Sequence, residues 1–302
     1  MTRDEFLSER FHEMTDKLSV FKSEFYKHPS TQRIDPFKIA DDLYYVGDKM
    51  VCIHLLDTGD GLVLFDSGYI GTAHLLVDSI WRLGFDPREV KYIIHTHGHH
   101  DHFGSSEEFR IMYGTKLIIS RIDAEALSEK PQLFMNRKNY PFGEIPRFDI
   151  TVEDGEVFEL GKYKIRFLLT PGHTDGVISS FFEVTDNGKA YLAGMFGGAG
   201  TNAVTLPYIH RNERVGDPAH DMLESIDKLL RVPVTLHLGN HPGNNDTIRK
   251  REKQLSEGGN PFTSESDWQG FLLNLRKRVE TIIADNAKTE EEIKSLIGDR
   301  NV

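Results

Sequence analysis

Hydrophobic and polar positions first follow a helical period along this chain. Over residues 1–28 the large apolar side chains recur at steps of three to five, which is the spacing of one face of an α-helix. They are Phe6, Phe11, Met14, Leu18, Phe21 and Phe25. Thr2 and Glu5 have the spacing of a capping box, and Pro29 ends the pattern. We expect an amphipathic helix that lies on the protein surface, with a dimerisation arm as the alternative.

From about Leu43 the pattern changes to short β-rich runs. A first series of strands is predicted at 43–46, 51–56, 62–65, 90–94 and 116–119, with a helix at about 72–83. A second series follows at 157–160, 164–169, 178–184, 190–192 and 234–238, with a hairpin turn at Asp186-Asn187-Gly188 and a helix at about 218–230. Two strand-rich series, each followed by helices, predict two sheets packed face to face with helices outside. The predicted fold class is therefore α/β, an αββα sandwich with extra N-terminal and C-terminal helices.

Three further stretches complete the predicted organisation. Residues 129–149 are expected to be irregular, 194–216 to form a long Gly-rich loop, and 264–297 to form a charged helix with a break near Asn286. We interpret residues 1–36 as an N-terminal helix and 37–245 as the sandwich domain. Residues 246–302 are expected to form a helical extension packed on that same domain.

Composition and charge exclude several classes of protein. Among 302 residues, 47 acidic side chains outnumber 36 basic ones, for a net charge of −11, so a nucleic-acid binder is not expected. No apolar run reaches the ~20 residues that span a bilayer, and the charged N-terminus lacks the apolar core of a secretory signal. The single cysteine, Cys52, excludes an internal disulfide and a cysteine-based zinc site. We expect a cytoplasmic protein, with export after removal of a signal as the alternative.

The strongest chemical signal directly follows the predicted strand 90–94. His97, His99, Asp101 and His102 form the pattern H-x-H-x-D-H. Imidazole nitrogens and a carboxylate suit Zn²⁺ and similar divalent ions. On a turn leaving a strand, the first two histidines can point to one side and Asp101 with His102 to another. One loop can therefore supply ligands to two neighbouring metal ions.

Two later histidines lie in turns at strand ends, where a sandwich gathers its loops. His173 lies in Thr170-Pro171-Gly172-His173, and His241 lies in Asn240-His241-Pro242-Gly243. His237 is a rival for the role of His241, but it falls within a predicted strand.

Together these residues resemble the metallo-β-lactamase superfamily over residues 37–245. The resemblance includes Asp66 in Phe65-Asp66-Ser67-Gly68, which implies a carboxylate that orients the ligands without binding metal itself. It further implies that His97, His99 and His173 hold one zinc ion. Asp101, His102 and His241 would hold the second. His95 and His100 are then expected to be packing or orienting residues.

One position separates the members of this family. Many of its hydrolases have an Asp after the Gly of the strand that follows the His173 turn, and this Asp bridges both metals. Here Met195 occupies the position, and a thioether cannot do so. The chain therefore most resembles the dizinc β-lactamase subclass with three-His and Asp-His-His sites, which has neither the bridging Asp nor a Cys ligand.

The resemblance implies a zinc-dependent hydrolase with two Zn²⁺ per chain. A metal-bridging hydroxide would attack a cyclic amide or ester carbonyl, above all that of a β-lactam, and Asp101 would orient the hydroxide and pass a proton to the leaving group. The alternative is a cytoplasmic lactonase or thioesterase with only promiscuous β-lactamase activity. A third interpretation, a regulator that binds metal without catalysis, is disfavoured because all six ligands are intact.

Substrate choice is expected to come from two loops. Residues 129–149 offer an apolar lip of Phe134, Met135, Tyr140 and Phe142. From the strand end and loop at 195–214 we select Met195, Phe196, Tyr208 and Arg211 as candidate pocket residues, and an Arg in this loop could pair with a substrate carboxylate. The expected partner is a small-molecule substrate, without nucleic acid or membrane. The oligomeric state stays open, with a homodimer as one option.

Overall fold

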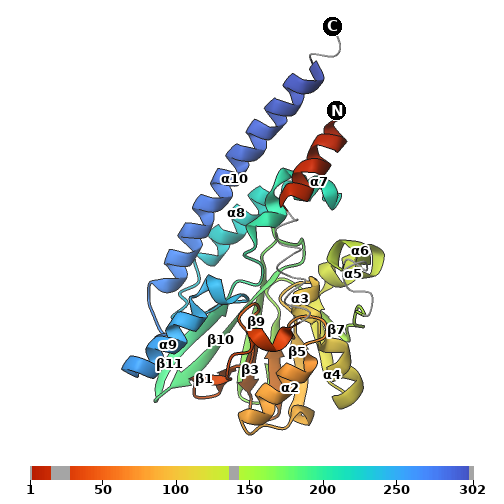
Figure 1. Cartoon of the computed structure of the whole chain (residues 1–302). Helices are drawn as coiled ribbons and strands as arrows, with labels where there is room; N and C mark the ends of the chain where they lie inside the picture. The colour runs from red at the N-terminus through yellow and green to blue at the C-terminus, as the bar shows by residue number, and fades with distance from the viewer. Residues whose placement is uncertain (1, 15–27, 136–142, 299–302) are drawn as a thin grey trace.

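Two β-sheets lie face to face at the centre of the molecule, with helices on both outer sides (Figure 1). The computed structural model describes residues 2–14, 28–135 and 143–298. The first sheet runs in the order β1 (Phe37–Ala40), β2 (Leu43–Tyr45), β3 (His54–Asp57), β4 (Leu62–Phe65), β5 (Val90–Ile94), β6 (Lys116–Ser120) and β7 (Ile150–Val152). The second has the order β12 (Leu236–Leu238), β11 (Lys189–Met195), β10 (Ile178–Asp186), β9 (Tyr163–Leu169) and β8 (Val157–Leu160).

The pairing of the strands decides which loops meet. Strands β4, β5 and β6 are parallel, so their carboxyl ends lie at the same edge of the first sheet. In the second sheet, β12 runs parallel to β11. Strands β10 and β11 form the predicted hairpin, in which Asn187 and Gly188 have left-handed φ values of 52° and 79°, as a tight two-residue turn requires.

Apolar side chains fill three layers, as the αββα arrangement predicts. Between the sheets, the rings of Phe65 and Phe182 stack with their centroids 5.1 Å apart. The outer side of the second sheet is covered by α8 (Pro218–Leu229) and α10 (Asp267–Gly298), whose buried Trp268 packs with Phe181. On the outer side of the first sheet lie α2 (Ala73–Arg82) and α4 (Ser106–Tyr113). The predicted fold class is confirmed.

The remaining helices are short or peripheral. They are η1 (Pro29–Gln32), η2 (Pro87–Glu89), α3 (His100–Phe103), α5 (Arg121–Glu129), α6 (Pro131–Phe134), η3 (Thr201–Val204), α7 (Leu206–Arg211), η4 (Pro242–Asn244) and α9 (Thr247–Glu257). The predicted loop 194–216 therefore contains two short helices, η3 and α7.

Helix α10 has no break at Asn286, so that prediction is wrong. The Asn286 side chain does not compete for the backbone of its own helix. Its Oδ1 accepts from the N–H of Leu206, and its Nδ2 donates to the carbonyl of Val204. The residue instead connects α10 to the start of α7.

The N-terminal helix is described over residues 3–14 and lies beside α7 and the upper part of α10 (Figure 1). Phe6 and Leu7 are buried there with Ile293, and Leu206 packs against them. The predicted continuation of this helix over 15–27 lies outside the described residues. The described part of this helix therefore packs on α7 and α10 of the same chain.

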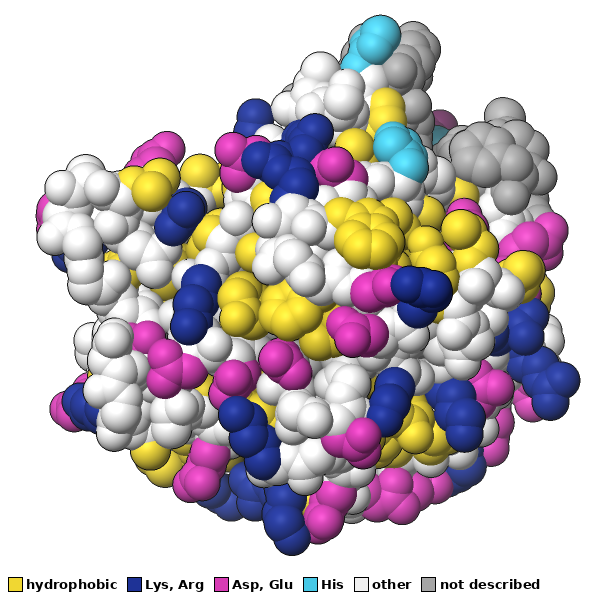
Figure 2. Space-filling view, turned by 90° about the horizontal axis from the view of Figure 1, so that it is seen from below, with side chains coloured by type: hydrophobic (Ala, Val, Ile, Leu, Met, Phe, Trp, Pro, Cys, Tyr) yellow, Lys and Arg dark blue, Asp and Glu magenta, His cyan; other side chains and the backbone are white. Residues whose placement is uncertain are grey.

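The surface seen from below carries both signs of charge interspersed, with hydrophobic side chains in separate small groups (Figure 2). No basic patch dominates this face, in keeping with the acidic balance of the chain. Among the described helices, none has an apolar stretch long enough to cross a bilayer.

Candidate metal centre

The six predicted ligands all lie in the connections that follow strands β5, β9 and β12. The H-x-H-x-D-H segment leaves β5, and its Asp101 and His102 lie on the one-turn helix α3. His173 lies between β9 and β10, and His241 follows β12. Both sheets therefore contribute, because the first sheet supplies the motif and the second supplies the two later histidines.

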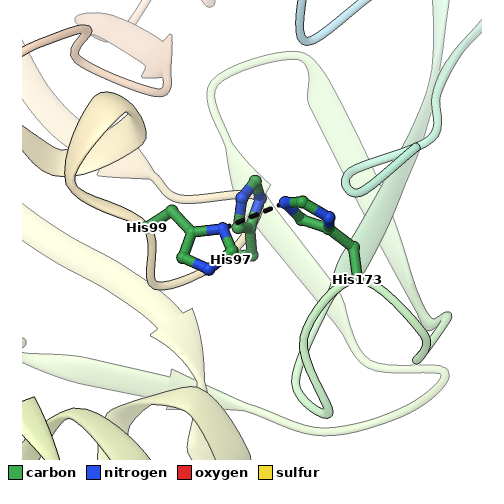
Figure 3. Close-up of side chains that lie close together, drawn as sticks. All are labelled: His97, His99 and His173. Carbon is green, nitrogen blue, oxygen red and sulfur yellow. Dashed lines mark hydrogen bonds between the residues drawn. The ribbon is translucent and has the colours of Figure 1, made fainter. Parts of the chain in front are cut away.

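His97, His99 and His173 point toward one another and form the first group (Figure 3). One ligand nitrogen from each lies within 4.8 Å of the others. Backbone carbonyls hold two of these rings by the nitrogen that faces away. The Nδ1 of His97 donates to Gly197 O at 2.8 Å, and the Nδ1 of His173 donates to Gly200 O at 2.7 Å. Each of these rings therefore directs its Nε2 inward.

Asp101, His102 and His241 form the second group, again with ligand atoms within 4.8 Å of one another. The Asp101 Oδ2 lies 3.8 Å from the Nε2 of both histidines. The Nδ1 of His102 donates to the Asp66 carboxylate at 2.7 Å, and that of His241 donates to Met50 O at 2.7 Å. Here too the Nε2 atoms are the ones left to face the group.

Electrostatics keep the first group in the neutral form that binds metal. Burial lowers the pKa of His97 and His99 well below the ordinary value, and it lowers the pKa of His173 to about 4. For His102, burial also lowers the pKa, but the carboxylates of Asp66 and Asp101 outweigh it and raise the pKa overall.

Two buried nitrogens indicate that both groups fit a metal ion. The Nε2 atoms of His97 and His102 have no hydrogen-bond partner within the part of the chain that the structure describes. An unsatisfied buried polar atom costs about 1–3 kcal/mol, so its presence requires an explanation. Each atom belongs to a cluster of nitrogen and oxygen donors of the kind that zinc prefers. A dinuclear metal site accounts for both.

Asp66 lies beneath the second group and is fully buried. Its carboxylate accepts from the backbone N–H and the hydroxyl of Thr96 at 2.8 and 2.9 Å, as well as from His102. Asp66 has a left-handed φ of 62°, an uncommon backbone conformation outside glycine, directly after β4. Through these contacts the Asp66 carboxylate can orient His102, the role that the family resemblance implies for it.

Asp123, which no sequence motif singled out, has a similar position behind the first group. It is buried near the start of α5, and its Oδ2 accepts from Gly98 N–H at 2.7 Å and from the Thr174 hydroxyl at 2.8 Å. Its Oδ1 accepts from Gly176 N–H at 2.9 Å. One carboxylate thus joins the loop of His97 and His99 to the loop of His173. Burial raises the pKa of Asp123 to about 6.

The other histidines near the motif have structural partners. His95 is fully buried, with Nδ1 donating to Ile118 O and Nε2 bonded to the Ser106 hydroxyl, so it does not face the metal groups. The Nδ1 of His100 donates to Phe134 O at 3.3 Å. His237 lies within β12 and packs on Trp268 and Phe271. The choice of His241 over His237 agrees with this placement.

A cavity of about 230 Å³ opens beside the first group. His99, His173 and Tyr208 are among its lining residues, and Phe134 adds an apolar side chain to the lining. Tyr208 therefore lies where the sequence placed a pocket residue. Of the other lip residues predicted from 129–149, Met135 is buried, and Tyr140 and Phe142 lie outside the described residues.

Three of the expected pocket residues do not line this cavity. Met195 and Phe196 are 1% exposed and belong to the hydrophobic clusters on the two sides of the second sheet. Arg211, at the end of α7, is exposed to solvent. Arg214 does line the cavity, but its terminal nitrogens donate to Gly172 O and to the Asp175 carboxylate. The Arg214 guanidinium therefore stabilises the loop that carries His173, and its hydrogen-bond donors are already used there.

Comparison with known proteins agrees with this geometry. A profile of the metallo-beta-lactamase superfamily matches residues 46–242. The hydroxyacylglutathione hydrolase of Methylococcus capsulatus is 30% identical over 103 residues. That match covers 34% of this chain and only 30% of the length of that enzyme.

Two solved structures match over most of the chain. The native FEZ-1 metallo-beta-lactamase from Legionella gormanii is 26% identical with a TM-score of 0.76, covering 85% of this chain and 98% of that one. BJP-1, a subclass B3 metallo-beta-lactamase of Bradyrhizobium japonicum, is 24% identical with a TM-score of 0.75, covering 85% and 97%. The resemblance predicted from the motifs is confirmed.

Proposed function

The chain belongs to the metallo-beta-lactamase superfamily and is a metal-dependent hydrolase, and from this premise we propose that it is a dizinc enzyme that hydrolyses the amide carbonyl of β-lactams. His97, His99 and His173 would hold one zinc ion. Asp101, His102 and His241 would hold the other. Residues 37–245 would form the catalytic unit, with 1–36 and 246–302 as helical extensions of it.

The observation that carries this proposal is the pair of three-residue groups without a bridging carboxylate. Met195, at the position where many hydrolases of the fold have an Asp, is buried in the core between the sheets. The same absence is typical of the β-lactamase subclass that the sequence resembles. The 26% identity with FEZ-1 over 85% of the chain supports the same choice.

When bound, the zinc ions would supply Lewis acidity and a water of lowered pKa, so that a nucleophile is available near neutral pH. The chain itself would handle orientation and protons. Asp101 Oδ2 lies between His102 and His241 and would accept a hydrogen bond from the attacking water. It would then hold the proton that the leaving nitrogen needs when the ring opens. Phe134 and Tyr208 would position the substrate in the cavity.

One observation favours a second candidate, hydrolysis of a thioester or lactone. Arg214, the arginine that lines the cavity, already donates to Gly172 O and Asp175, so it is not set aside for a substrate carboxylate. The local identity to a hydroxyacylglutathione hydrolase points the same way. A substrate without a carboxylate beside its reacting carbonyl would need no arginine partner in this cavity.

The deciding experiment compares substrates on one preparation. Zinc-loaded protein is assayed with a chromogenic cephalosporin, a carbapenem, an acyl-glutathione thioester and an acyl lactone, with chelated protein and His99→Ala as controls. We expect a chelator-sensitive kcat/KM at or above about 10⁴ M⁻¹s⁻¹ for the β-lactams, in the range of ordinary enzymes. Turnover confined to the thioester or lactone would establish the second candidate and reject the first.

A further inference from the structure

The hydroxyl of Tyr208 lies 3.3 Å from the Nε2 of His99. That nitrogen faces away from the first metal group. The other ring nitrogen, Nδ1, faces it and lies 3.0 Å from the Nε2 of His173 (Figure 3). His97 and His173 are oriented by fixed backbone carbonyls, whereas the corresponding contact of His99 is a side-chain hydroxyl.

In the protein without metal, the hydrogen bonds determine which ring nitrogen of His99 and of His173 carries the proton. His173 donates its Nδ1–H to Gly200 O, so in its neutral form its Nε2 is an acceptor. His99 must therefore donate Nδ1–H to that acceptor, and its own Nε2 accepts from the Tyr208 hydroxyl. A His99 that binds metal through Nδ1 must carry its proton on Nε2 instead. It would then donate to the oxygen of Tyr208.

A hydroxyl serves both states because it is a donor and an acceptor, whereas a backbone carbonyl could serve only the second. We propose that Tyr208 is a positioning residue, which holds the ring of His99 with and without metal, and that the N-terminal helix keeps Tyr208 in place. This inference rests on the proposed assignment of His99 as a ligand.

Helix α7, which carries Tyr208, is only six residues long and is held by other elements. Asn286 of α10 bonds to the start of α7. From the other side, the ring of Phe11 lies against that of Tyr208, with centroids 6.2 Å apart. The Thr205 hydroxyl, just before α7, contacts Met14 Sδ at 3.9 Å. The N-terminal helix thus contacts both the start of α7 and its tyrosine.

The N-terminal helix also contacts α10 directly. Arg3 pairs with Glu290 at 2.6 Å, and Leu7 is fully buried in a cluster with Ile293. These contacts lie outside the metal centre. A helix anchored in this way can restrict Tyr208 without contributing any atom to the site.

The test measures metal binding, which does not require the substrate to be known. Metal-free protein is titrated with Co²⁺ against a competing chelator, while the visible spectrum reports the ligand geometry. For Tyr208→Phe we expect the first Co²⁺ to bind roughly tenfold more weakly, the usual loss when an outer contact of a ligand is removed, with an altered spectrum and unchanged thermal stability. The matched control is Tyr113→Phe on α4, whose ring packs on Phe109 far from the metal groups, and it should change nothing.

A second variant tests the helix. Phe11→Ala keeps the tyrosine hydroxyl but removes the ring against it, and we expect a smaller loss of Co²⁺ binding than in Tyr208→Phe. In the Tyr208→Phe background, Phe11→Ala should add no further loss, because it acts through the tyrosine. Unchanged Co²⁺ binding in Tyr208→Phe would overturn the inference, and independent, additive losses would overturn the role of the helix. If no substrate is turned over while Tyr208→Phe still weakens Co²⁺ binding, the proposed function fails and the positioning role stands.

Discussion

The three-histidine group and the Asp101–His102–His241 group are neighbours, but their surroundings differ in kind. The first is electrically neutral, lies beside the cavity, and is oriented by backbone carbonyls and the Tyr208 hydroxyl. The second contains one carboxylate and contacts another, since Asp66 lies fully buried behind His102. A buried carboxylate therefore contacts a ligand ring directly only in the second group, whereas in the first the buried Asp123 contacts the loops that carry the rings.

This difference has a consequence for stability without metal. Removing the ring of His99 from the first group leaves the Tyr208 hydroxyl, an uncharged group that lines the cavity. Removing His102 leaves the Asp66 carboxylate buried without its ring partner, and an uncompensated buried charge is costly. The two groups should therefore respond alike in catalysis but differently in folding.

We expect the largest effect on hydrolysis when one histidine ligand is removed from either group. His99→Ala and His102→Ala should both reduce hydrolysis to background and bind about one metal fewer per chain, measured by mass spectrometry of the metal content. In urea unfolding of metal-free protein, His102→Ala should lose about 3 kcal/mol. His99→Ala should stay within about 1 kcal/mol of the parent. Equal losses of stability in both variants would contradict the comparison.

The next effect concerns the two orienting carboxylates. Asp66→Asn should weaken metal binding at the second group, and Asp123→Asn at the first, each by about 10- to 100-fold. The second group contains the carboxylate of Asp101, whereas the first contains only histidines. Loss of Co²⁺ from one group or from the other should therefore give different visible spectra. If Asp66→Asn and Asp123→Asn weaken the binding of the same metal ion, the two carboxylates do not act on different metal groups.

The pH dependence of the free energy of unfolding should also reveal the raised pKa of Asp123. Burial raises its pKa to about 6 in the folded protein, from an ordinary value of 3.8. The folded state therefore holds this proton more tightly than the unfolded state, and stability falls as the pH rises between about 4 and 6. The loss amounts to about 3 kcal/mol at neutral pH. For metal-free Asp123→Asn, the free energy of unfolding measured with urea should not fall between about pH 4 and 6. The same pH dependence in the variant and the parent would contradict this prediction.

The smallest effect compares two glycines in the ligand loops. A Cβ at Gly200 would lie 2.6 Å from Cε1 of His173, so Gly200→Ala should displace that ring and weaken metal binding by a few-fold. A Cβ at Gly243, two residues after His241, would meet nothing within 4 Å. Gly243→Ala should therefore bind both metals like the parent in the same Co²⁺ titration, and weakened binding there would show that the loops are generally sensitive to substitution.

Much of the site could be predicted because its chemistry is concentrated in one short motif. The strands that carry the loops were also predictable. The limits of β4, β5 and β8 agree residue for residue with the expected 62–65, 90–94 and 157–160, because turn residues bound each apolar or β-branched run.

Asp123 could not be found in this way. It lies three residues after Ser120, whose hydroxyl accepts from the N–H of Asp123, so in sequence it is an ordinary acidic residue in the first turn of a helix. Its contacts with Gly98 and Thr174 exist only once β6 lies beside β5 and the second sheet covers the first. The same holds for Arg214, because the partners that occupy its guanidinium lie about 40 residues away along the chain.

Each metal group takes ligands from loops of both sheets, so the thermal stability of the protein should depend on how much metal it has bound. An ion in the first group would connect β5 to the loop after β9, and an ion in the second would connect β5 to the loop after β12. The sheets could then separate only by releasing the ions. At free metal 100 times the dissociation constant, each independent site would add about 2.7 kcal/mol to stability. A simple melting curve would therefore read out the metal content of a preparation before any substrate is known.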